Sequence, residues 1–318
     1  MDVSVVIPLF NERESLGELV AQLHQVCGSQ GWTYEVLLID DGSTDGSWAE
    51  IERLAATDGR VKGIRFGRNY GKSPALNVGF AATHGQVVVT MDADLQDDPN
   101  ELPELVRMVR VDGFDLVSGW KQKRHDPLSK TIPTKLFNWA TRRVSGVKLH
   151  DFNCGLKAYR ADVVKAIEVY GEMHRYIPYI AHKEGFRRIG EKVVQHHARK
   201  YGRSKFGLDR FINGFLDLLT IHFVHRFGRK PMHFFGAFGT LMFVVGFLSA
   251  AWVIGEKLWH VYVMKQPAPR VSDQGLFFVA LTSMIIGVQL FTAGFVAQLV
   301  SRNAADRDHY RITGKVGL

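Results

Sequence analysis

The sequence predicts an α/β protein in which a mostly parallel sheet domain is followed by amphipathic helices and a hairpin of two membrane-crossing helices. Two observations predict this architecture. Short β-rich runs alternate with helical stretches through residues 3–118, and two later runs of 25 and 28 residues contain no Asp, Glu, Lys or Arg. Strands separated by helices form βαβ units on a parallel sheet, and about 20 apolar residues suffice to cross a bilayer.

Five runs rich in β-branched and aromatic residues predict the strands of the sheet. They cover residues 3–9, 34–39, 61–66, 86–91 and 114–118. The helices expected between them lie near residues 14–27, 45–56, 73–83 and 101–111. Ligand sites in such sheets lie beyond the carboxyl ends of the strands, so the residues that follow each strand are the first candidates for function. Residues 121–190 show a mixed pattern that predicts no single element.

The two uncharged runs cover residues 231–255 and 274–301 and are rich in Phe, Leu, Val, Ile, Met, Gly and Ala. This composition is typical of helices that lie in lipid and pack on each other, and a pair of buried core helices is the alternative. The join between them contains Trp259, Tyr262 and two prolines, as expected for a turn at a membrane interface. We therefore expect a transmembrane hairpin over residues 231–301.

Basic residues flank this hairpin on both sides. His, Arg and Lys residues between 222 and 230 precede the first span, and four Lys or Arg residues follow the second. The positive-inside rule places both ends of the hairpin in the cytosol. The prediction is a multi-pass protein of the plasma (inner) membrane, with a cytosolic catalytic domain over residues 1–205, amphipathic juxtamembrane helices over 206–230 and a cytosolic tail over 302–318.

The net charge of +8 is concentrated in one segment of the chain. Residues 1–194 carry a net charge of −1, whereas residues 195–230 carry +6. The near-neutral sheet domain argues against a nucleic-acid-binding protein, and the basic segment fits phosphate groups or the anionic surface of a membrane. Two cysteines far apart in the sequence are too few for a disulfide framework.

The strongest polar cluster follows the fourth predicted strand. Asp92 and Asp94 are two residues apart, so both carboxylates can point the same way from the end of a strand, and Gln96 adds an amide oxygen. Oxygen ligands of this kind suit Mg²⁺ or Mn²⁺ and leave coordination positions for phosphate oxygens. An acidic N-cap for the next helix is the alternative, and it is the role expected for Asp97 or Asp98.

A second acidic turn, residues 40–46 (DDGSTDG), closes the second predicted strand. Its carboxylates could accept hydrogen bonds from a nucleobase and a ribose, and a purely structural turn is the alternative. No Gly-x-Gly-x-x-Gly follows the first strand, which argues against a dinucleotide-binding fold. The run at residues 67–73 imitates a P-loop but is one residue too short between its glycines, which argues against a Walker-type ATPase.

Six runs, taken in order along the chain, form a larger pattern. They are residues 5–12 (VVIPLFNE), 38–45 (LIDDGSTD), 68–72 (RNYGK), 91–99 (MDADLQDDP), 151–160 (DFNCGLKAYR) and 199–205 (RKYGRSK). Together with the two-span tail, this pattern resembles family 2 glycosyltransferases, specifically the polyprenyl-phosphate glycosyltransferases related to dolichol-phosphate mannosyltransferase, in their bacterial form with two transmembrane helices. The resemblance implies a GT-A fold, which is a Rossmann-like α/β domain.

The resemblance implies a hexosyltransferase of cell-envelope glycan biosynthesis. It would move a sugar, with inversion, from a nucleotide-sugar donor to polyprenyl (undecaprenyl) phosphate at the cytosolic membrane face. A UDP-sugar, with UDP-glucose or a related hexose first, is the expected donor, and Mg²⁺ or Mn²⁺ the expected cofactor. A mannosyltransferase that uses GDP-mannose is the main alternative. A processive polysaccharide synthase would carry a Gln-x-x-Arg-Trp signature, which the sequence lacks, and a non-enzymatic membrane anchor would not need both acidic turns.

The site residues carried over by this resemblance fall into four groups. The nucleotide-sugar would be bound by Pro8, Phe10, Glu12, Asp40, Asp41, Lys72, Asp92 and Ala93. The metal ligands would be Asp92, Asp94 and Gln96, and the catalytic residues Asp94, Asp151 and Lys205, with a structural role as the alternative for Asp151. The diphosphate and the lipid phosphate would be bound by Arg199, Arg203, Ser204 and Lys205.

A second basic group, Lys121, Lys123, Arg124 and Lys135, could also meet the lipid phosphate, and a solvated surface is the alternative. Two residues depart from the family pattern, because Lys157 stands where relatives often have Arg and Gln298 where they often have Glu. A lipid monophosphate is largely ionised at neutral pH, since its second pKa is about 6, so no strong general base is expected. Gly236, Gly239 and Gly246 would let helices approach closely, which leaves a homo-oligomer open.

Overall fold

The computed structural model describes residues 1–122, 138–139, 141–143, 145–171, 173–198, 200–201, 231–267, 270–303 and 312–317. The chain divides into two compact units. The first comprises Met1–Ile221 and Asp308–Leu318, and the second comprises His222–Arg307. The amphipathic helices predicted at 206–230 lie outside the described residues.

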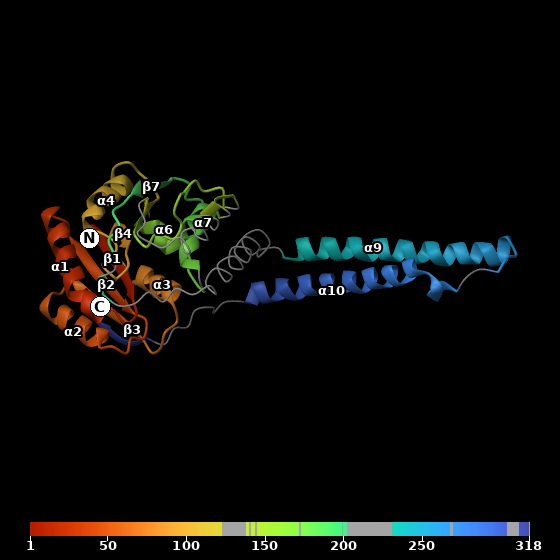
Figure 1. Cartoon of the computed structure of the whole chain (residues 1–318), viewed down its shortest axis with the longest axis horizontal. Helices are drawn as coiled ribbons and strands as arrows, with labels where there is room; N and C mark the ends of the chain where they lie inside the picture. The colour runs from red at the N-terminus through yellow and green to blue at the C-terminus, as the bar shows by residue number, and fades with distance from the viewer. Residues whose placement is uncertain are drawn as a thin grey trace. The chain divides into compact units, whose positions relative to one another are not determined.

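An eight-stranded sheet forms the centre of the first unit (Figure 1). Its strands are β1 (Val3–Leu9), β2 (Tyr34–Asp40), β3 (Val61–Phe66), β4 (Val87–Thr90), β5 (Leu116–Trp120), β6 (Lys157–Arg160), β7 (Ile189–Val193) and β8 (Ile312–Val316). Their order across the sheet is β7-β5-β6-β4-β1-β2-β3-β8.

The parallel part of the sheet is the part that the sequence predicts. Strands β4, β1, β2 and β3 run parallel to one another, whereas β6 pairs antiparallel with both β4 and β5. Strand β6 comes from the segment for which the sequence predicts no element, and it separates β4 from β5. The α/β class is therefore confirmed, and the sheet is mixed in its outer half.

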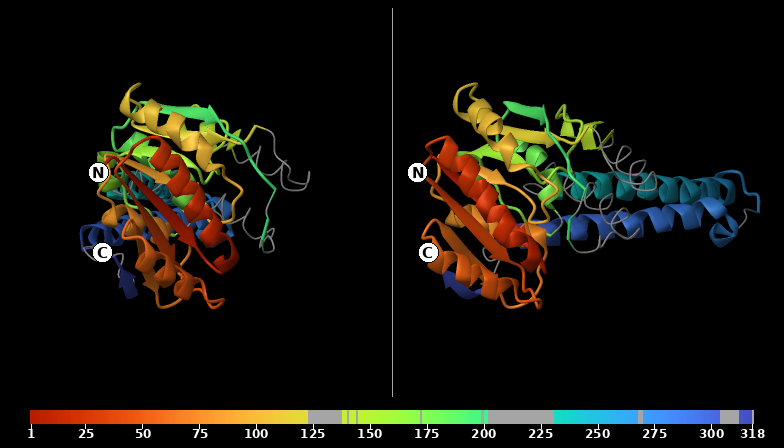
Figure 2. Two further views of the ribbon diagram at one scale, coloured as in Figure 1. Left: turned by 90° about the vertical axis from the view of Figure 1, so that its left-hand side faces the viewer. Right: turned by 60° about the vertical axis from the view of Figure 1, so that its left-hand side comes forward.

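Helices cover both faces of the sheet (Figures 1 and 2). One face packs against α1 (Arg13–Ser29), α2 (Ser47–Thr57) and α4 (Leu102–Arg110), and the other against α3 (Lys72–Ala82), α6 (Ala161–Ala166) and α7 (Ile177–Lys183). Two 3₁₀ turns, η1 (Pro99–Glu101) and η2 (Met173–Tyr176), precede α4 and α7. All seven residues of β1 are buried. Successive side chains of β1 enter opposite cores, which explains why all of its residues except Ser4 are apolar.

The last strand lies beyond the hairpin in the sequence, yet it belongs to the first unit. The sequence predicts only a tail there, but β8 pairs antiparallel with β3 and forms the edge of the sheet. A Cβ on Gly63 would lie 2.9 Å from Val316 Cγ1 and 3.2 Å from Trp48 Cζ3, so glycine is required where β8 and α2 meet β3. Both ends of the hairpin therefore connect to the first unit.

The second unit is a pair of long helices, α9 (Pro231–Leu258) and α10 (Gly275–Asn303), joined by the π turn η3 (Trp259–Val263) and the 3₁₀ turn η4 (Val271–Asp273). Over Met232–Val263 and Gly275–Ala297 the chain is long and apolar enough to cross a membrane. The prediction that the two apolar runs form long helices is therefore confirmed.

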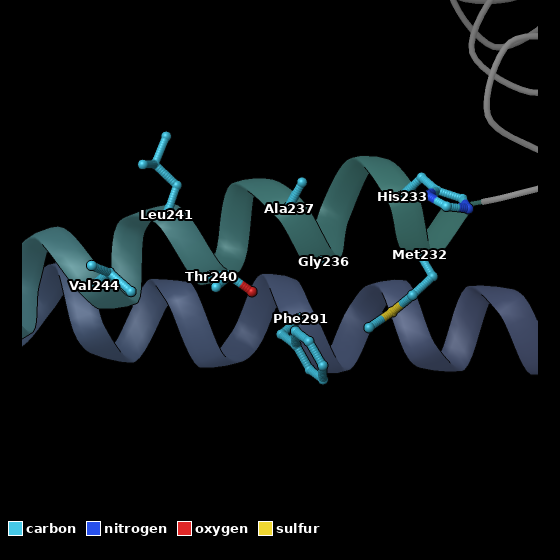
Figure 3. Close-up of a pocket in the computed structure, with 8 residues that line it drawn as sticks. All are labelled: Met232, His233, Gly236, Ala237, Thr240, Leu241, Val244 and Phe291. Carbon is cyan, nitrogen blue, oxygen red and sulfur yellow. The ribbon is translucent and has the colours of Figure 1, made fainter.

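The two helices meet through glycines. A Cβ on Gly239 would lie 2.5 Å from the Gly287 carbonyl oxygen, and one on Gly246 would lie 2.6 Å from the Ala280 carbonyl oxygen. Close approach of this kind is how helices pack in lipid, where apolar burial supplies little driving force. Gly239 and Gly246 thus allow the close contact between α9 and α10 of one chain. A groove of about 530 Å³ lies beside Gly236, Thr240 and Phe291 on the α9 side of the pair (Figure 3).

Candidate active site

The carboxyl ends of β1, β2, β3 and β4 bring three loops together at one end of the sheet. These are the loop after β1 (residues 10–12), the turn after β2 (residues 40–46, the Asp40 turn) and the loop after β4 (residues 91–98, the Asp92 loop). Asn11 and Leu95, which lie in two of these loops, have φ angles of 57° and 58°. Residues other than glycine rarely adopt this left-handed conformation, so surrounding contacts must hold both loops.

The Asp40 turn is tied to its neighbours by backbone contacts. Asp40 is fully buried and accepts a 2.9 Å hydrogen bond from the Ser43 N–H. The Asn11 N–H donates to Ser43 Oγ at 2.8 Å, and the Asn11 side chain accepts from the Thr44 N–H at 2.8 Å. A Cβ on Gly42, whose φ is +76°, would lie 2.4 Å from the backbone of Arg68. The turn is therefore packed between the loops that follow β1 and β3.

Asp41 holds the loop that follows β3. Its two carboxylate oxygens accept hydrogen bonds from the N–H groups of Tyr70 and Gly71, at 2.7 and 2.9 Å. Burial raises the pKa of Asp41 to about 6, because it outweighs these two hydrogen bonds and because Asp40 lies beside it. Asp40 and Asp41 thus lie at the predicted position, and both shape the loops around it.

Three of the predicted nucleotide ligands lie at the end of β1 and in the loop that follows it. Pro8 is buried within β1, opposite Ile39 of β2, whereas Phe10 and Glu12 are partly exposed beyond the strand. Phe10 and Glu12 therefore present more surface to a ligand than Pro8 does. Ala93, predicted at the same subsite, is buried in the core.

Asp92 forms an ion pair with Lys72, which begins α3. Its carboxylate also packs against the backbone after Cys154, because a Cβ on Gly155 would lie 2.5 Å from Asp92 Oδ2. Burial alone raises the pKa of Asp92, but the charges of Lys72 and Lys121 lower it below its usual value. Asp92 is therefore an ionised carboxylate that Lys72 positions.

Asp94 and Gln96, the other two predicted metal ligands, lie on either side of Leu95 in the Asp92 loop. Asp94 is only 8% exposed, and its carboxylate accepts a 3.2 Å hydrogen bond from the Gln96 N–H. Among the residues that the structure describes, no group of three or more His, Cys, Asp or Glu side chains could hold a metal ion. A carboxylate at Asp94 with the amide oxygen of Gln96 fits a hard cation whose remaining ligands come from phosphate and water.

The structure gives Lys121 a partner within the protein. Its ammonium lies 2.7 Å from Asp97 Oδ1, and its side chain is 12% exposed. Burial lowers the pKa of Lys121, but the adjacent Asp97 raises it above the usual value. Asp98, as expected of one of these two acids, caps η1 by accepting from the Asn100 N–H at 2.9 Å. Other predicted phosphate ligands, Lys123, Arg124, Lys135, Arg199, Arg203, Ser204 and Lys205, lie outside the described residues.

Asp151, one of the predicted catalytic residues, is 1% exposed and accepts a 3.0 Å hydrogen bond from the Asn153 N–H within its own turn. Lys157 is 3% exposed and donates to the Cys154 carbonyl oxygen. Burial lowers the pKa of Lys157. Both residues belong to the segment that carries Gly155, and their contacts support this turn.

His174 and Arg175 are candidate site residues that the sequence does not predict. They belong to η2 and line a small cavity together with Lys72 and Lys157. The His174 N–H donates to Ser73 Oγ at 2.9 Å, and burial holds the pKa of His174 well below its usual value. No motif surrounds these two residues, so only the fold brings them to the Lys72 side of the site.

Comparisons with known proteins identify the family of this chain. The model of the glycosyl transferase family 2 matches residues 4–168. The dodecaprenyl-phosphate galacturonate synthase of Rhizobium johnstonii is 34% identical over 305 residues, which cover 95% of this chain and 88% of the relative. The undecaprenyl-phosphate 4-deoxy-4-formamido-L-arabinose transferase of Edwardsiella ictaluri is 36% identical over 303 residues, covering 94% and 89%.

Among solved structures, a mannosyltransferase from Pyrobaculum calidifontis in complex with GDP-Man and Mn²⁺ shares the fold. Its TM-score is 0.51 at 16% identity, and the alignment covers 96% of this chain and 76% of that one. The match supports the GT-A fold that the six runs of sequence imply. The chain is therefore a glycosyltransferase that belongs to glycosyl transferase family 2, and nearly its whole length is similar to members of the family that act on polyprenyl phosphates.

Proposed function

We propose that this enzyme transfers a sugar, with inversion, from a nucleotide-sugar to a polyprenyl phosphate at the cytosolic face of the inner membrane. The observation that carries the proposal is the position of Asp92 and Asp94. Both follow β4 at the same end of the sheet as the Asp40 turn, in a chain whose similarity to prenyl-phosphate sugar transferases continues through the hairpin. Acidic residues at this position suit a donor that carries a diphosphate, a ribose and a base.

In the proposed reaction a phosphate oxygen of the lipid attacks the anomeric carbon of the sugar. The bond from that carbon to the nucleoside diphosphate breaks, and its electron pair leaves with the diphosphate. A single displacement of this kind inverts the anomeric centre. The lipid phosphate is already ionised near pH 7, because its second pKa is about 6, so no side chain has to remove a proton from it.

The residues of the Asp92 loop would hold a divalent cation, Mg²⁺ or Mn²⁺, through Asp94 and Gln96, with Asp92 beside them. When bound, the cation neutralises charge that develops on the leaving diphosphate. Lys72 keeps Asp92 ionised and in place. The basic run at 199–205, with Lys205 as the first candidate, would bind the diphosphate and the lipid phosphate.

For the donor we propose a UDP-sugar, with glucose or a related hexose first. Galacturonate and 4-deoxy-4-formamido-L-arabinose, which appear in the names of two relatives, are the next sugars to test. GDP-mannose is the alternative donor. Each donor is supplied in a separate reaction, so the donor that yields a lipid product is identified even where two sugars, such as glucose and mannose, have the same mass.

The path of the chain from the first unit through the hairpin to β8 supports the proposed membrane topology. Strand β8 follows the hairpin and pairs with β3, so the chain leaves the first unit before α9 and returns to it after α10. Only an even number of crossings returns a chain to the side from which it started. We therefore propose two spans, with the catalytic domain and β8 both in the cytosol. Reporter fusions after residue 318 and in the turn at 264–274 should give opposite orientations.

The proposed activity is tested with the full chain in detergent or nanodiscs. Purified protein, undecaprenyl phosphate and Mn²⁺ or Mg²⁺ are incubated with each nucleotide-sugar, and the lipid product is detected by mass. We expect one donor to yield glycosyl undecaprenyl phosphate, and we expect chelation of the metal to stop the reaction. Failure of all these donors with both metals would contradict the proposal.

A further inference from the structure

We infer that Asp97, Lys121 and the segment at residues 195–198 hold the Asp92 loop from two sides, so that Asp97 and Lys121 act as positioning residues for the metal ligands. This inference rests on the proposed function, because it assigns Lys121 to the metal-binding loop instead of to the lipid phosphate.

The first side of this arrangement is a buried ion pair. Asp97 is 1% exposed, although it directly follows the proposed ligand Gln96. One of its carboxylate oxygens lies 2.7 Å from Lys121 Nζ, and the other accepts a 3.4 Å hydrogen bond from the Asp92 N–H. The Asp97 carboxylate therefore connects the beginning and the end of the loop and fixes both to β5, which Lys121 follows.

The second side is a short antiparallel bridge that runs along the loop. Asp97 and His196 form the bridge, and the His197 N–H donates to the Gln96 carbonyl oxygen at 2.9 Å. The Gln96 side-chain N–H donates a 3.5 Å hydrogen bond to the His197 carbonyl oxygen. Gln96 is thus held by its backbone and by its side-chain nitrogen, which leaves its side-chain oxygen as the atom for a cation.

The two sides share one anchor in the core. Val194 is 4% exposed, and its N–H donates to the Trp120 carbonyl oxygen at 3.1 Å, directly before Lys121. The Gln195 N–H then donates to Glu101 of η1 at 3.1 Å. Each residue from Val194 to His197 thus makes a backbone contact with a neighbouring segment, so this stretch can act as a fixed support for the Asp92 loop.

A physical reason explains why the loop needs such support. Leu95 lies between Asp94 and Gln96 with a φ of 58°, a conformation that an isolated loop would leave. Ligand side chains must be held within about 0.5 Å of their productive geometry to bind a metal well. The ion pair and the bridge supply that constraint from residues that do not themselves reach the cation.

The inference is tested by Mn²⁺ binding to the full-length protein in the presence of UDP or of GDP, measured by electron paramagnetic resonance. The variants are Asp97→Asn, Lys121→Met and the double variant. We expect each single variant to weaken Mn²⁺ binding about tenfold, as for residues that orient metal ligands. The double variant should be no weaker than the singles, because both changes break one interaction. Lys121→Arg keeps the charge and should restore most of the binding.

A matched control is Lys62→Met. Lys62 also pairs with a fully buried carboxylate, that of Glu35, at 3.0 Å, but at the amino end of the strands. If loss of a buried pair only loosened the fold, this variant would weaken Mn²⁺ binding as well. We expect it to leave Mn²⁺ binding unchanged, and thermal unfolding of every variant is measured beside it.

Two results would overturn the inference. In the first, Lys121→Met has a higher KM for polyprenyl phosphate but binds Mn²⁺ as tightly as the wild type. Lys121 would then be a phosphate ligand. In the second, the effects of the two changes multiply in the double variant. A wild-type protein that binds Mn²⁺ but transfers no sugar would contradict the proposed function instead, and the Mn²⁺ measurements would still decide the role of Asp97 and Lys121.

Discussion

The two ends of the central strands bury carboxylates in opposite ways. At the amino end, Glu35 is fully buried and accepts hydrogen bonds from Ser4 Oγ, the His84 N–H and Lys62 Nζ, at 2.6, 2.8 and 3.0 Å. Burial by itself raises the pKa of Glu35, but these hydrogen bonds lower it below its usual value. Each carboxylate oxygen of Glu35 is thus supplied with donors from the protein.

At Asp41, at the carboxyl end, burial dominates over the available donors. The pKa of Asp41 rises to about 6 because burial outweighs its two backbone hydrogen bonds, and Asp40 adds a second carboxylate beside it. Neighbouring carboxylates disfavour each other's ionised form unless a cation joins them. The amino end is therefore organised for stability alone, whereas the carboxyl end gains from a ligand that brings positive charge.

The largest expected difference between the two ends is in catalysis. Asp94→Asn should lower kcat about 100-fold or more, since it removes the proposed metal ligand, while the unfolding temperature stays close to that of the wild type. Glu35→Gln, at the amino end, should leave kcat unchanged and cost about 1–3 kcal/mol of unfolding free energy through its weakened buried hydrogen bonds. Product formation by mass spectrometry and thermal unfolding are measured together. Normal turnover by Asp94→Asn would remove Asp94 from the reaction.

A smaller effect is expected from the backbone behind Asp92. Gly155→Ala places a Cβ 2.5 Å from Asp92 Oδ2, so the carboxylate and its Lys72 partner have to move. Displacement on this scale should lower kcat about 10- to 100-fold. Gly28→Ala, at a helical glycine with no atom within 4 Å of the new Cβ, is the control and should keep full activity. Equal activity of the two variants would show that the position of Asp92 does not matter.

The smallest effect is expected in the pH dependence of stability, where the two ends have opposite signs. Between its usual pKa of 3.8 and its folded value of about 6, Asp41 binds more protons in the folded protein than in the unfolded chain. Its contribution to the unfolding free energy is therefore present at low pH and is lost as the pH rises through about 6. Two pKa units correspond to at most about 3 kcal/mol.

Glu35 has a lowered pKa, so its contribution is present at neutral pH and is lost as the pH falls through the folded pKa. Denaturant unfolding of the full chain from about pH 2 to 7 compares the wild type with Asp41→Asn and Glu35→Gln. Asp41→Asn should remove the fall in stability between about pH 4 and 6, and Glu35→Gln should remove part of the loss in acid. A wild-type slope retained by Asp41→Asn would contradict the assignment.

The parallel half of the sheet could be predicted from the sequence because its strands are apolar runs rich in valine and isoleucine and are separated by helices. β1 begins and ends at the predicted residues, and β2 and β4 differ by a residue or two. In the outer half, β5 could be predicted, but β6 and β7, which contain charged residues, could not. Strands β6 and β7 have only four and five residues. Tertiary pairing with β4 and β5 stabilises them, since so short a run has little preference of its own.

The same division holds for the candidate site. Asp92 and Asp94 could be found because a strand end is a position with a known geometry, and the resemblance then supplied their chemistry. The ion pair of Asp97 with Lys121 could not be found, since it joins two loops that only the sheet brings together. The contact between Ser73 and His174 spans 101 residues and has no local pattern.

The sequence by itself therefore determined the α/β class, the two apolar helices, the acidic loops and the family, because all of these depend on local periodicity or on residues that are adjacent in the chain. Only the tertiary structure decided the order of β6, β5 and β7, the return of β8 to the sheet and the partners of Asp41, Asp92 and Lys121. Contacts between distant segments depend on packing and on the cost of burying charge, and these appear only when the chain has folded.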